Sequence, residues 1–229
     1  TPMAPDACGG STTVTWTYTS SCAPTTTTCT ATFTVDPSPP VVFTCATSKT
    51  EAACQTQAAI DASFAAWLLT TTASGGCNGM LTTSPSNPMA PDACGGSTTV
   101  TWTYTSSCTP MTTTCTATFT VDPSPPVVFT CAADKTEAAC QTQAAIDSKF
   151  SAWLATSTIS GGCNPNHTNN AGAAPNHCGG STSVTFTVTS DCDSPKTCVA
   201  TFTVTAASAV VLTCPSNTTE LACQSQADI

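Results

Sequence analysis

The sequence has very little charge and almost no basic residues. Charged residues make up 7% of its 229 residues, lysine supplies all four basic side chains, and the formal net charge is -9. Nucleic-acid binding needs Lys or Arg to replace the counterions on phosphates, so that class of function is excluded. The apolar runs are too short to span a bilayer, and no basic-then-apolar signal segment opens the chain. We therefore expect no membrane span and no nucleic-acid partner.

Cysteine and threonine are abundant instead. The chain has 17 cysteines, and 40% of its residues are hydrophobic. Hydrophobic content at this level, with few charges, can form a core and argues against disorder. Cysteines at this density persist as disulfides in oxidising compartments. The sequence therefore predicts a folded, extracellular or cell-surface protein.

The chain is built from near-identical repeats. Residues 2–22 recur unchanged at 88–108, and the similarity continues through Ile60 and Ile146. A third copy is recognisable from Cys178 onward. Self-similarity over this length indicates tandem domains larger than the units of solenoids.

Pro-rich segments divide the repeats. DPSPP at 36–40 and at 122–126 suits a stiff, extended linker, and TAASA stands in the same place at 205–209. The predicted domains are the C-terminal part of a repeat (1–40), two complete repeats (41–126 and 127–209) and the N-terminal part of a repeat (210–229). The two part-repeats together lack a counterpart of 61–86, so we expect a window of a longer array rather than self-complementing subunits.

A short strand and a helix are predicted near the start of each repeat. VVFTC at 41–45 is an apolar run suited to a buried strand. Good N-cap residues then stand three positions before a glutamate in all three copies, which indicates a helix start. These cap residues are Ser48, Asp134 and Asn217. The predicted helices cover about 49–72 and 135–158, and Gly75-Gly76 supplies the first stop.

The helical stripe and a hairpin supply the predicted core. Ile60, Phe64, Trp67 and Leu68 share one helix face, and Trp67 and its repeat counterpart Trp153 are expected to be core residues. In STTVTWTYT and TCTATFTV, apolar residues alternate strictly with threonine, which predicts a hairpin with one core face and one threonine face. The core face should bury three equivalent residues: Trp16, Trp102 and Phe186.

Disulfides are expected to staple each domain. Parity places Cys22 and Cys29 on one face at the hairpin mouth, which favours a cross-strand bond. Six cysteines per domain allow many connectivities, and pairing each with its sequence neighbour is the simplest. That scheme gives 22–29, 45–54, 77–94, 108–115, 131–140, 163–178, 192–198 and 214–223, that is Cys22, Cys29, Cys45, Cys54, Cys77, Cys94, Cys108, Cys115, Cys131, Cys140, Cys163, Cys178, Cys192, Cys198, Cys214 and Cys223. Cys8 is left unpaired.

The motifs together resemble a known family. CGGSTTVTWTYTSSC followed by TCTATFTV, the segment VVLTCPSNTTELACQSQADI and the GGCN turn resemble the HYR-like (hyalin-repeat-like) domains of Bacteroidota surface adhesins and fibres. The resemblance implies mainly β, immunoglobulin-like sandwich domains in tandem, with no catalytic residues. A full sandwich of this type has about seven strands. Here three or four strong strands and a helix are found, so we expect a smaller sheet with the helix covering one face.

Residues able to carry chemistry are sparse. His167 and His177 flank a loop, but the other copies have no histidine there, so a metal site is a weak hypothesis. One aspartate per linker, Asp36 and Asp122, is thin support for calcium. No arrangement typical of a nucleophile, a phosphate loop or a paired-carboxylate site occurs. We expect no enzyme activity and no cofactor.

The threonine faces have three readings. Threonine is β-branched and polar, and so suits a solvent-facing strand without any further role. Dense O-glycosylation would add covalent glycans, chiefly in the loops 24–28, 81–86 and 109–114. An ice-binding array would need a flat surface, which a twisted hairpin hardly offers.

Taken together, the sequence predicts a structural repeat segment of an extracellular fibre or adhesin stalk. Near-identical successive surfaces let one contact recur at every joint, and repeated contacts that do not close produce filaments. The expected partners are therefore further repeats of the same kind. The alternative is an adhesin module that binds glycans or a host surface, which exposed aromatic residues would favour.

Overall fold

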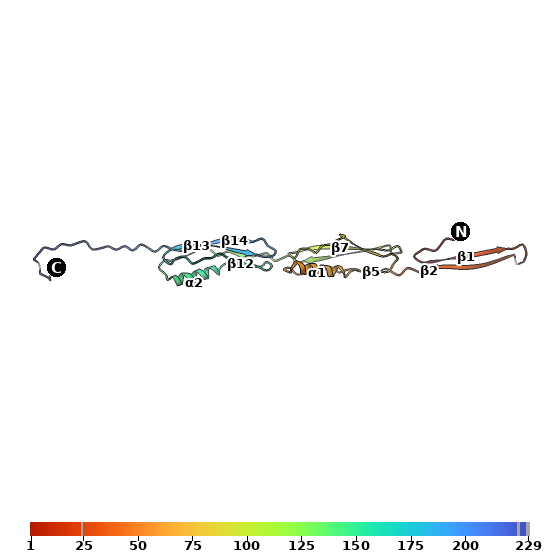
Figure 1. The fold of residues 1–229 in the computed structure, drawn as a ribbon, viewed down its shortest axis with the longest axis horizontal. Coiled ribbons are helices and arrows are strands. Elements are labelled where there is room, and N and C mark those ends of the chain that lie inside the picture. Colours follow the sequence, from red (N-terminus) through yellow and green to blue (C-terminus); the bar gives the residue numbers. More distant parts are fainter. Residues whose placement is uncertain (24, 224, 228–229) are drawn as a thin grey trace. The chain divides into compact units, whose positions relative to one another are not determined.

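The computed structural model describes residues 1–23, 25–223 and 225–227 (Figure 1). Strands dominate, and two helices are present in these ranges. The chain separates into two compact units. Unit 1 comprises Thr1–Val128, Ser160–Asn166 and Thr189–Ser194, and unit 2 comprises Phe129–Ile159, His167–Val188 and Pro195–Ile229.

The first strands of unit 1 form a two-stranded antiparallel hairpin. It consists of β1 (Gly10–Thr19) and β2 (Thr26–Val35), in a register that places Trp16 opposite Cys29. The alternation of apolar residues and threonine therefore produces the predicted hairpin.

Residues 41–126, the first predicted complete repeat, lie within unit 1. Its elements are β3 (Val42–Thr44), β4 (Lys49–Glu51), α1 (Gln57–Leu68), β5 (Thr72–Ser74), β6 (Met80–Ser84), β7 (Gly96–Thr105) and β8 (Thr112–Val121). A four-stranded sheet has the order β4-β8-β7-β6, and β3 pairs with β5. The β4–β8 pair is parallel, whereas β6–β7 and β7–β8 are antiparallel.

The next repeat has the same elements in the same order. They are β9 (Val128–Thr130), β10 (Lys135–Glu137), α2 (Gln143–Leu154), β11 (Thr158–Ser160), β12 (Asn166–Asn169), β13 (Gly180–Thr189) and β14 (Lys196–Val204). The four-stranded order is β10-β14-β13-β12, and β11 pairs with β9. The fold is thus repeated, as the sequence is.

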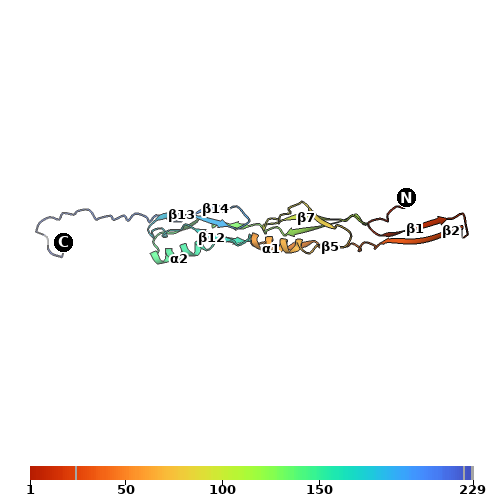
Figure 2. The ribbon, with the colours of Figure 1, turned by 45° about the vertical axis from the view of Figure 1, so that its right-hand side comes forward.

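The core of each repeat lies between the helix and the four-stranded sheet. The Trp67 ring packs edge-on against Trp102 with centroids 5.3 Å apart, and Phe64 packs edge-on against Phe119 at the same separation. Trp153 is buried in the same position in the next repeat. In Figures 1 and 2, α1 runs alongside the β7 sheet. The predicted core roles of Trp67 and Trp153 are confirmed.

The predicted fold class is confirmed by this architecture. The chain is mainly β, with tandem, disulfide-stapled β-sandwich domains that each contain one helix. One layer is the four-stranded sheet, and the other is the helix with the two-stranded sheet. The helix thus takes the place of part of a second sheet.

The predicted helix boundaries were too wide. The helices cover Gln57–Leu68 and Gln143–Leu154, and Thr56 and Thr142 are their N-caps. The expected caps act elsewhere: Ser48 Oγ accepts from the Thr118 amide at 3.1 Å, and Asp134 Oδ1 accepts from the Thr201 amide at 2.8 Å. Their following residues form short edge strands because they pair with a hairpin strand distant in sequence. A local capping pattern cannot reveal that pairing.

The prediction for the hairpin faces was right in two copies and wrong in one. Trp102 is 2% exposed and Phe186 is fully buried, but Trp16 is 53% exposed. The face of Trp16 is the expected one. It is open because no strand–helix layer lies on β1–β2 among the described residues.

The segment after β14 contains no helix or strand in its described part, 205–223 and 225–227. Figure 2 shows it as an extended trace. The helix expected after Asn217 is therefore not present there, and Val210, Val211 and Leu212 are exposed. Residues 224, 228 and 229 of the predicted part-repeat lie outside the described residues.

Two half-buried carboxylates on edge strands, Glu51 and Glu137, make the stability of the fold depend on pH. A hydrogen bond from Ser63 and contacts with Lys49 lower the pKa of Glu51 from its ordinary value of 4.5 to about 2. Lys149, 2.6 Å from Glu137, lowers the pKa of that carboxyl to about 2. A carboxyl whose pKa is lower in the folded state stabilises the fold above its unfolded pKa. This contribution is lost as the pH falls from about 5 toward 2.

We therefore expect the thermal unfolding midpoint to fall over that acid range, measured by calorimetry at constant ionic strength. Glu51→Gln with Glu137→Gln should lower the midpoint at pH 7 and flatten its acid dependence. A double variant with the acid profile of the parent chain would contradict this assignment.

Candidate functional site: the junctions between repeats

Five disulfides link cysteines that are distant in sequence. They are Cys8–Cys108, Cys45–Cys115, Cys54–Cys163, Cys94–Cys192 and Cys131–Cys198. Two of them, Cys45–Cys115 and Cys131–Cys198, each join two cysteines of the same repeat. The other three, with sequence separations of 100, 109 and 98, join cysteines of adjacent repeats.

The neighbour-pairing scheme was wrong for every pair. Cys45 bonds Cys115 rather than Cys54, Cys54 bonds Cys163, and Cys8, expected to be unpaired, bonds Cys108. The strand register explains why the predicted pair Cys22–Cys29 does not form. Cys29 lies opposite Trp16 within the paired strands, whereas Cys22 lies beyond the end of β1. Neither is in a disulfide. The other predicted pairs that do not form are 77–94, 108–115, 131–140, 163–178, 192–198 and 214–223.

The first junction holds the Pro-rich segment 36–40 by backbone contacts. The Ser38 amide donates to the Cys8 carbonyl at 3.0 Å, and the Gly76 amide donates to the Pro39 carbonyl at 2.8 Å. Cys108, buried at 3% exposure, bonds Cys8. The segment is therefore fixed from both sides.

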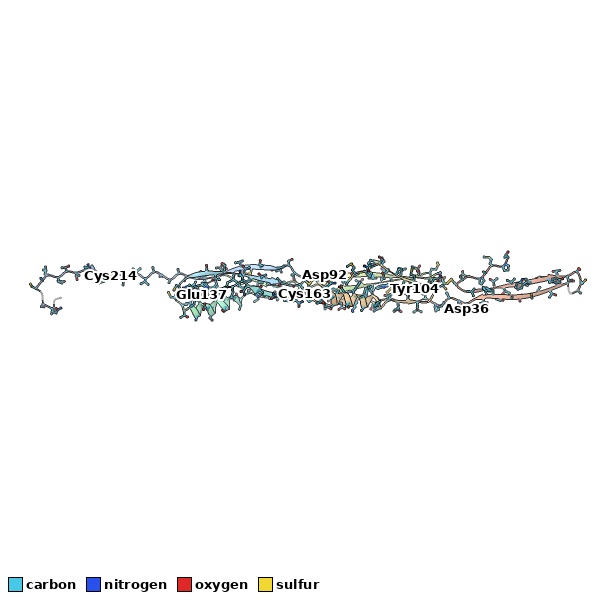
Figure 3. The ribbon with its side chains drawn as sticks, viewed as in Figure 1. Asp36, Asp92, Tyr104, Glu137, Cys163 and Cys214 are labelled. Carbon is cyan, nitrogen blue, oxygen red and sulfur yellow. A yellow bond between two sulfur atoms is a disulfide. The ribbon has the colours of Figure 1, made fainter. Side chains whose placement is uncertain are left out.

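A turn of the following repeat completes this junction. The Tyr104 hydroxyl, labelled in Figure 3, donates to the Gly75 carbonyl at 2.7 Å. Ser106 Oγ accepts from the Cys77 amide at 3.0 Å, and the Ser107 amide donates to the Cys77 carbonyl at 2.9 Å. The GGCN turn is therefore part of the junction, although the sequence predicted only that a helix ends there.

The second junction repeats these contacts one period later, also within unit 1. The Ser124 amide donates to the Cys94 carbonyl at 2.9 Å, and the Gly162 amide donates to the Pro125 carbonyl at 3.0 Å. Cys94 bonds Cys192, and Cys163, labelled in Figure 3, bonds Cys54. Two disulfides therefore hold this junction. The Pro-rich segments expected to be stiff, extended linkers are therefore held by backbone hydrogen bonds to the residues around them.

Glycine is required where the turn meets the linker. Gly75 has φ of +83°, and a Cβ built on it would lie 1.9 Å from the Pro40 carbonyl oxygen. Gly161 is equivalent, with φ of +70° and a Cβ 2.2 Å from the Pro126 oxygen. Gly75→Ala should therefore lower the free energy of unfolding by about 1 to 3 kcal/mol.

Thermal unfolding measured by calorimetry tests this expectation. Gly172→Ala is the matched control, since a Cβ at Gly172 meets nothing within 4 Å. Equal effects of the two substitutions would show that the close approach at Gly75 does not constrain the junction.

Seven cysteines of the described part lie outside disulfides: Cys22, Cys29, Cys77, Cys140, Cys178, Cys214 and Cys223. Each stands at a repeat position whose counterpart is bonded. Cys77 corresponds to Cys163, which bonds Cys54, and Cys178 corresponds to Cys94, which bonds Cys192. Each of these seven cysteines therefore occupies a repeat position that forms a disulfide elsewhere in the chain, and that disulfide indicates which cysteine position would pair with it.

The two histidines have separate partners in unit 2. His167 Nε2 lies 3.0 Å from Ser157 Oγ, and its ring packs against Phe129 and Phe186. His177 contacts Gln143. In the described ranges no group of three His, Cys, Asp or Glu side chains is arranged to hold a metal ion. These contacts account for both histidines as structural residues.

The threonine faces are exposed and internally hydrogen-bonded. Hydroxyl pairs lie 2.9 Å apart across the hairpins at Thr13–Thr32 and Thr99–Thr118. Of the loops expected to carry glycans, 81–86 is largely strand, since β6 covers Met80–Ser84. Residue 24 of the loop 24–28 lies outside the described residues.

Neither described helix is long and apolar enough to cross a membrane. No protein-family model and no curated protein sequence matches the chain. Several solved structures resemble it weakly. PcdhgB3 EC1-4 is 8% identical with a TM-score of 0.32, and the match covers 87% of this chain and 59% of that one. For the protocadherin gamma B2 extracellular cadherin domains 3–6, the values are 11%, 0.32, 88% and 59%.

The protocadherin gammaB7 EC3-6 cis-dimer structure is 13% identical with a TM-score of 0.30, and the match covers 86% of this chain and 58% of that one. The chain spans about three fifths of the first of these structures. Likenesses at this level carry no argument about fold or function. The chain is therefore described by its own features: tandem β domains whose junctions are closed by disulfides.

Proposed function

We propose that the chain is a structural repeat segment of an extracellular stalk or fibre, whose repeats are locked to one another by disulfides. The observation that supports this most is that three of the five disulfides join adjacent repeats. Disulfides persist in oxidising, extracellular settings, which supports the location. The role is mechanical: the domains resist extension and keep a fixed spacing.

The disulfide loops overlap along the chain. The loop closed by Cys8 and Cys108 contains Cys94, which is itself bonded to Cys192. A force applied at the two ends therefore passes from Cys8 to Cys108, back to Cys94, and on to Cys192. Most of the backbone is outside this covalent path and bears no load.

Single-molecule extension tests this function. In the oxidised chain only about 60 residues should extend, to roughly 200 Å, whereas the reduced chain should extend to roughly 780 Å. A variant with Cys45→Ala and Cys131→Ala is the control. It removes the two bonds within repeats and should still stop at about 200 Å, since the path between repeats is intact.

Other extensions would contradict the proposal. Bonds between sequence neighbours would shorten the chain only by small loops and allow roughly 500 Å. An oxidised chain that extended as far as the reduced chain would remove the covalent basis of the mechanical role.

The partners are further repeats of the same kind. The cysteines outside disulfides would form the same bonds, within and between repeats, with further copies of the repeat, which continues the array. The HYR-like motifs quoted above support membership of that type of Bacteroidota surface protein. The mass of native material, measured under non-reducing and under reducing conditions, tests whether repeats are joined in such an array.

We also propose O-linked glycans on the exposed threonines outside the paired strand centres. The support is the low charge of the chain, in which 7% of residues are charged, together with exposed hydroxyl faces. Intact mass equal to that of the bare polypeptide minus disulfide hydrogens would eliminate this proposal. The ice-binding hypothesis gains no support from these features.

An adhesin module is the alternative function, and exposed aromatic residues were its expected sign. Trp16 and Tyr18 are indeed 53% and 73% exposed. Their counterparts Trp102 and Tyr104 are buried, at 2% and 6%. The exposed aromatic residues therefore belong to an uncovered core face, which favours the structural function.

A further inference from the structure

Two hairpins of this chain have identical strands. β1 and β7 both read GSTTVTWTYT, and β2 and β8 both read TTTCTATFTV. Their registers also agree, with Trp16 opposite Cys29 and Trp102 opposite Cys115. Any difference in burial between them must come from what lies on the hairpin.

The β7–β8 hairpin has a covered apolar face. Phe119 is fully buried, and α1 supplies the rings of Phe64 and Trp67 against it, with centroids 5.3 Å and 5.5 Å away. The short strand β4 also pairs with β8, in parallel. The cover is therefore the strand–helix segment 41–86 of the same repeat.

The β1–β2 hairpin has the same face without this cover. Phe33, the counterpart of Phe119, is 65% exposed. Met3, Val14 and Phe33 line a shallow hollow of about 250 Å³ beside it. Large apolar side chains that gather on one exposed face mark an interaction site.

We propose that the apolar face of β1–β2 binds the strand–helix segment of another repeat of the same kind, that is, a segment of the type of 41–86. The identity of the two hairpins specifies this partner. A surface with the same residues in the same register fits the same aromatic helix face and the same parallel edge strand.

A disulfide would fix the bound segment. Cys29 is exposed and outside any disulfide, and its counterpart Cys115 bonds Cys45 from the strand–helix segment. The partner therefore supplies the cysteine of the Cys45 position. Its thiol and that of Cys29 form the bond by losing two electrons and two protons to glutathione disulfide, which is reduced to two molecules of glutathione.

This inference rests on the proposed function in one respect: the array would supply the strand–helix segment that binds. Extension under force depends on bonds already present in the chain, and binding to β1–β2 depends on an open face. The two experiments can therefore fail separately.

The test adds a polypeptide probe to the intact 229-residue chain in a glutathione redox buffer. The probe has the sequence of residues 41–86 with Cys54→Ser and Cys77→Ser, so that Cys45 is its one thiol. We expect a mixed disulfide between the probe and Cys29, found by non-reducing peptide mapping. Ala23 in the Cys29 peptide distinguishes it from the Cys115 peptide, which has Thr109 instead.

Two controls show whether the helix face carries the binding. A probe of residues 41–56 lacks the helix and should give at least tenfold less of the mixed disulfide. Phe33→Asp in the full chain should reduce it similarly, because the substitution places a charge on the apolar face. Equal capture of the short and long probes would overturn the proposal.

A fused chain excludes failure of the free probe to fold. Residues 41–86 are placed directly before Thr1, where residue 86 is followed by the counterpart of Thr1 in the natural repeat. We expect a disulfide between the added Cys45 and Cys29, and hydrogen-exchange protection across 32–35, the counterparts of the β8 residues that contact Ser48 and β4. A fused chain without either would overturn the proposal.

Discussion

Trp102→Ala should lower the free energy of unfolding by about 3 to 5 kcal/mol. The indole is 2% exposed and packs against Trp67, so its removal leaves a cavity between the sheet and the helix. Calorimetry or denaturant unfolding of the full chain measures the loss in the transition of the unit that contains β7.

Trp16→Ala is the matched control in an identical strand. Since Trp16 is 53% exposed, its truncation should change the stability by no more than about 0.5 kcal/mol. Equal losses for the two substitutions would show that the two hairpins are equally covered, and would contradict both the burial difference and the open face of β1–β2.

Loss of the Cys45–Cys115 bond should have an effect of similar size. The bond closes 70 residues, and the chain-entropy account assigns a loop of this length about 4 kcal/mol. Cys45→Ala with Cys115→Ala should therefore lower the stability of the repeat 41–126 by about that amount. Denaturant unfolding under oxidising conditions measures it.

The control uses the equivalent strand cysteine that has no partner. Cys29→Ala with Cys22→Ala removes two exposed cysteines that are outside disulfides, and should leave the stability nearly unchanged. A large loss for this pair, with none for Cys45 and Cys115, would mean that the hairpin disulfide predicted from parity forms after all.

Local patterns were enough to predict much of the fold. The alternation in STTVTWTYT predicted the hairpin and its faces, because side chains alternate across a strand whatever covers it. The Phe64 and Trp67 stripe predicted the helix face that meets the sheet. The repeat itself predicted that the architecture would recur.

The features that were missed depend on contacts between distant residues. Thr50 pairs with Thr120, so the residues expected to begin a helix form an edge strand instead. The disulfides join residues between 67 and 109 positions apart, and no sequence spacing reports such proximity. Three of them also join adjacent repeats. A scheme that pairs cysteines only within one domain cannot predict such bonds.

One signal in the sequence did indicate the junctions. Glycine pairs precede Cys77 and Cys163 and follow Cys8, Cys94 and Cys178. Of these, Gly75-Gly76 was interpreted as a helix stop. Residues 69–74 separate the end of α1 from Gly75, and positive φ at these glycines serves a close approach to the linker. Repeated glycine beside repeated cysteine is the better sign of a backbone contact.

Disulfide mapping of the oxidised chain by mass spectrometry of non-reduced peptides tests the locked array most directly. The account predicts linked peptides for Cys8–Cys108, Cys54–Cys163 and Cys94–Cys192, which join adjacent repeats. Linked peptides between sequence neighbours in place of these three, such as Cys163–Cys178 or Cys192–Cys198, would contradict it.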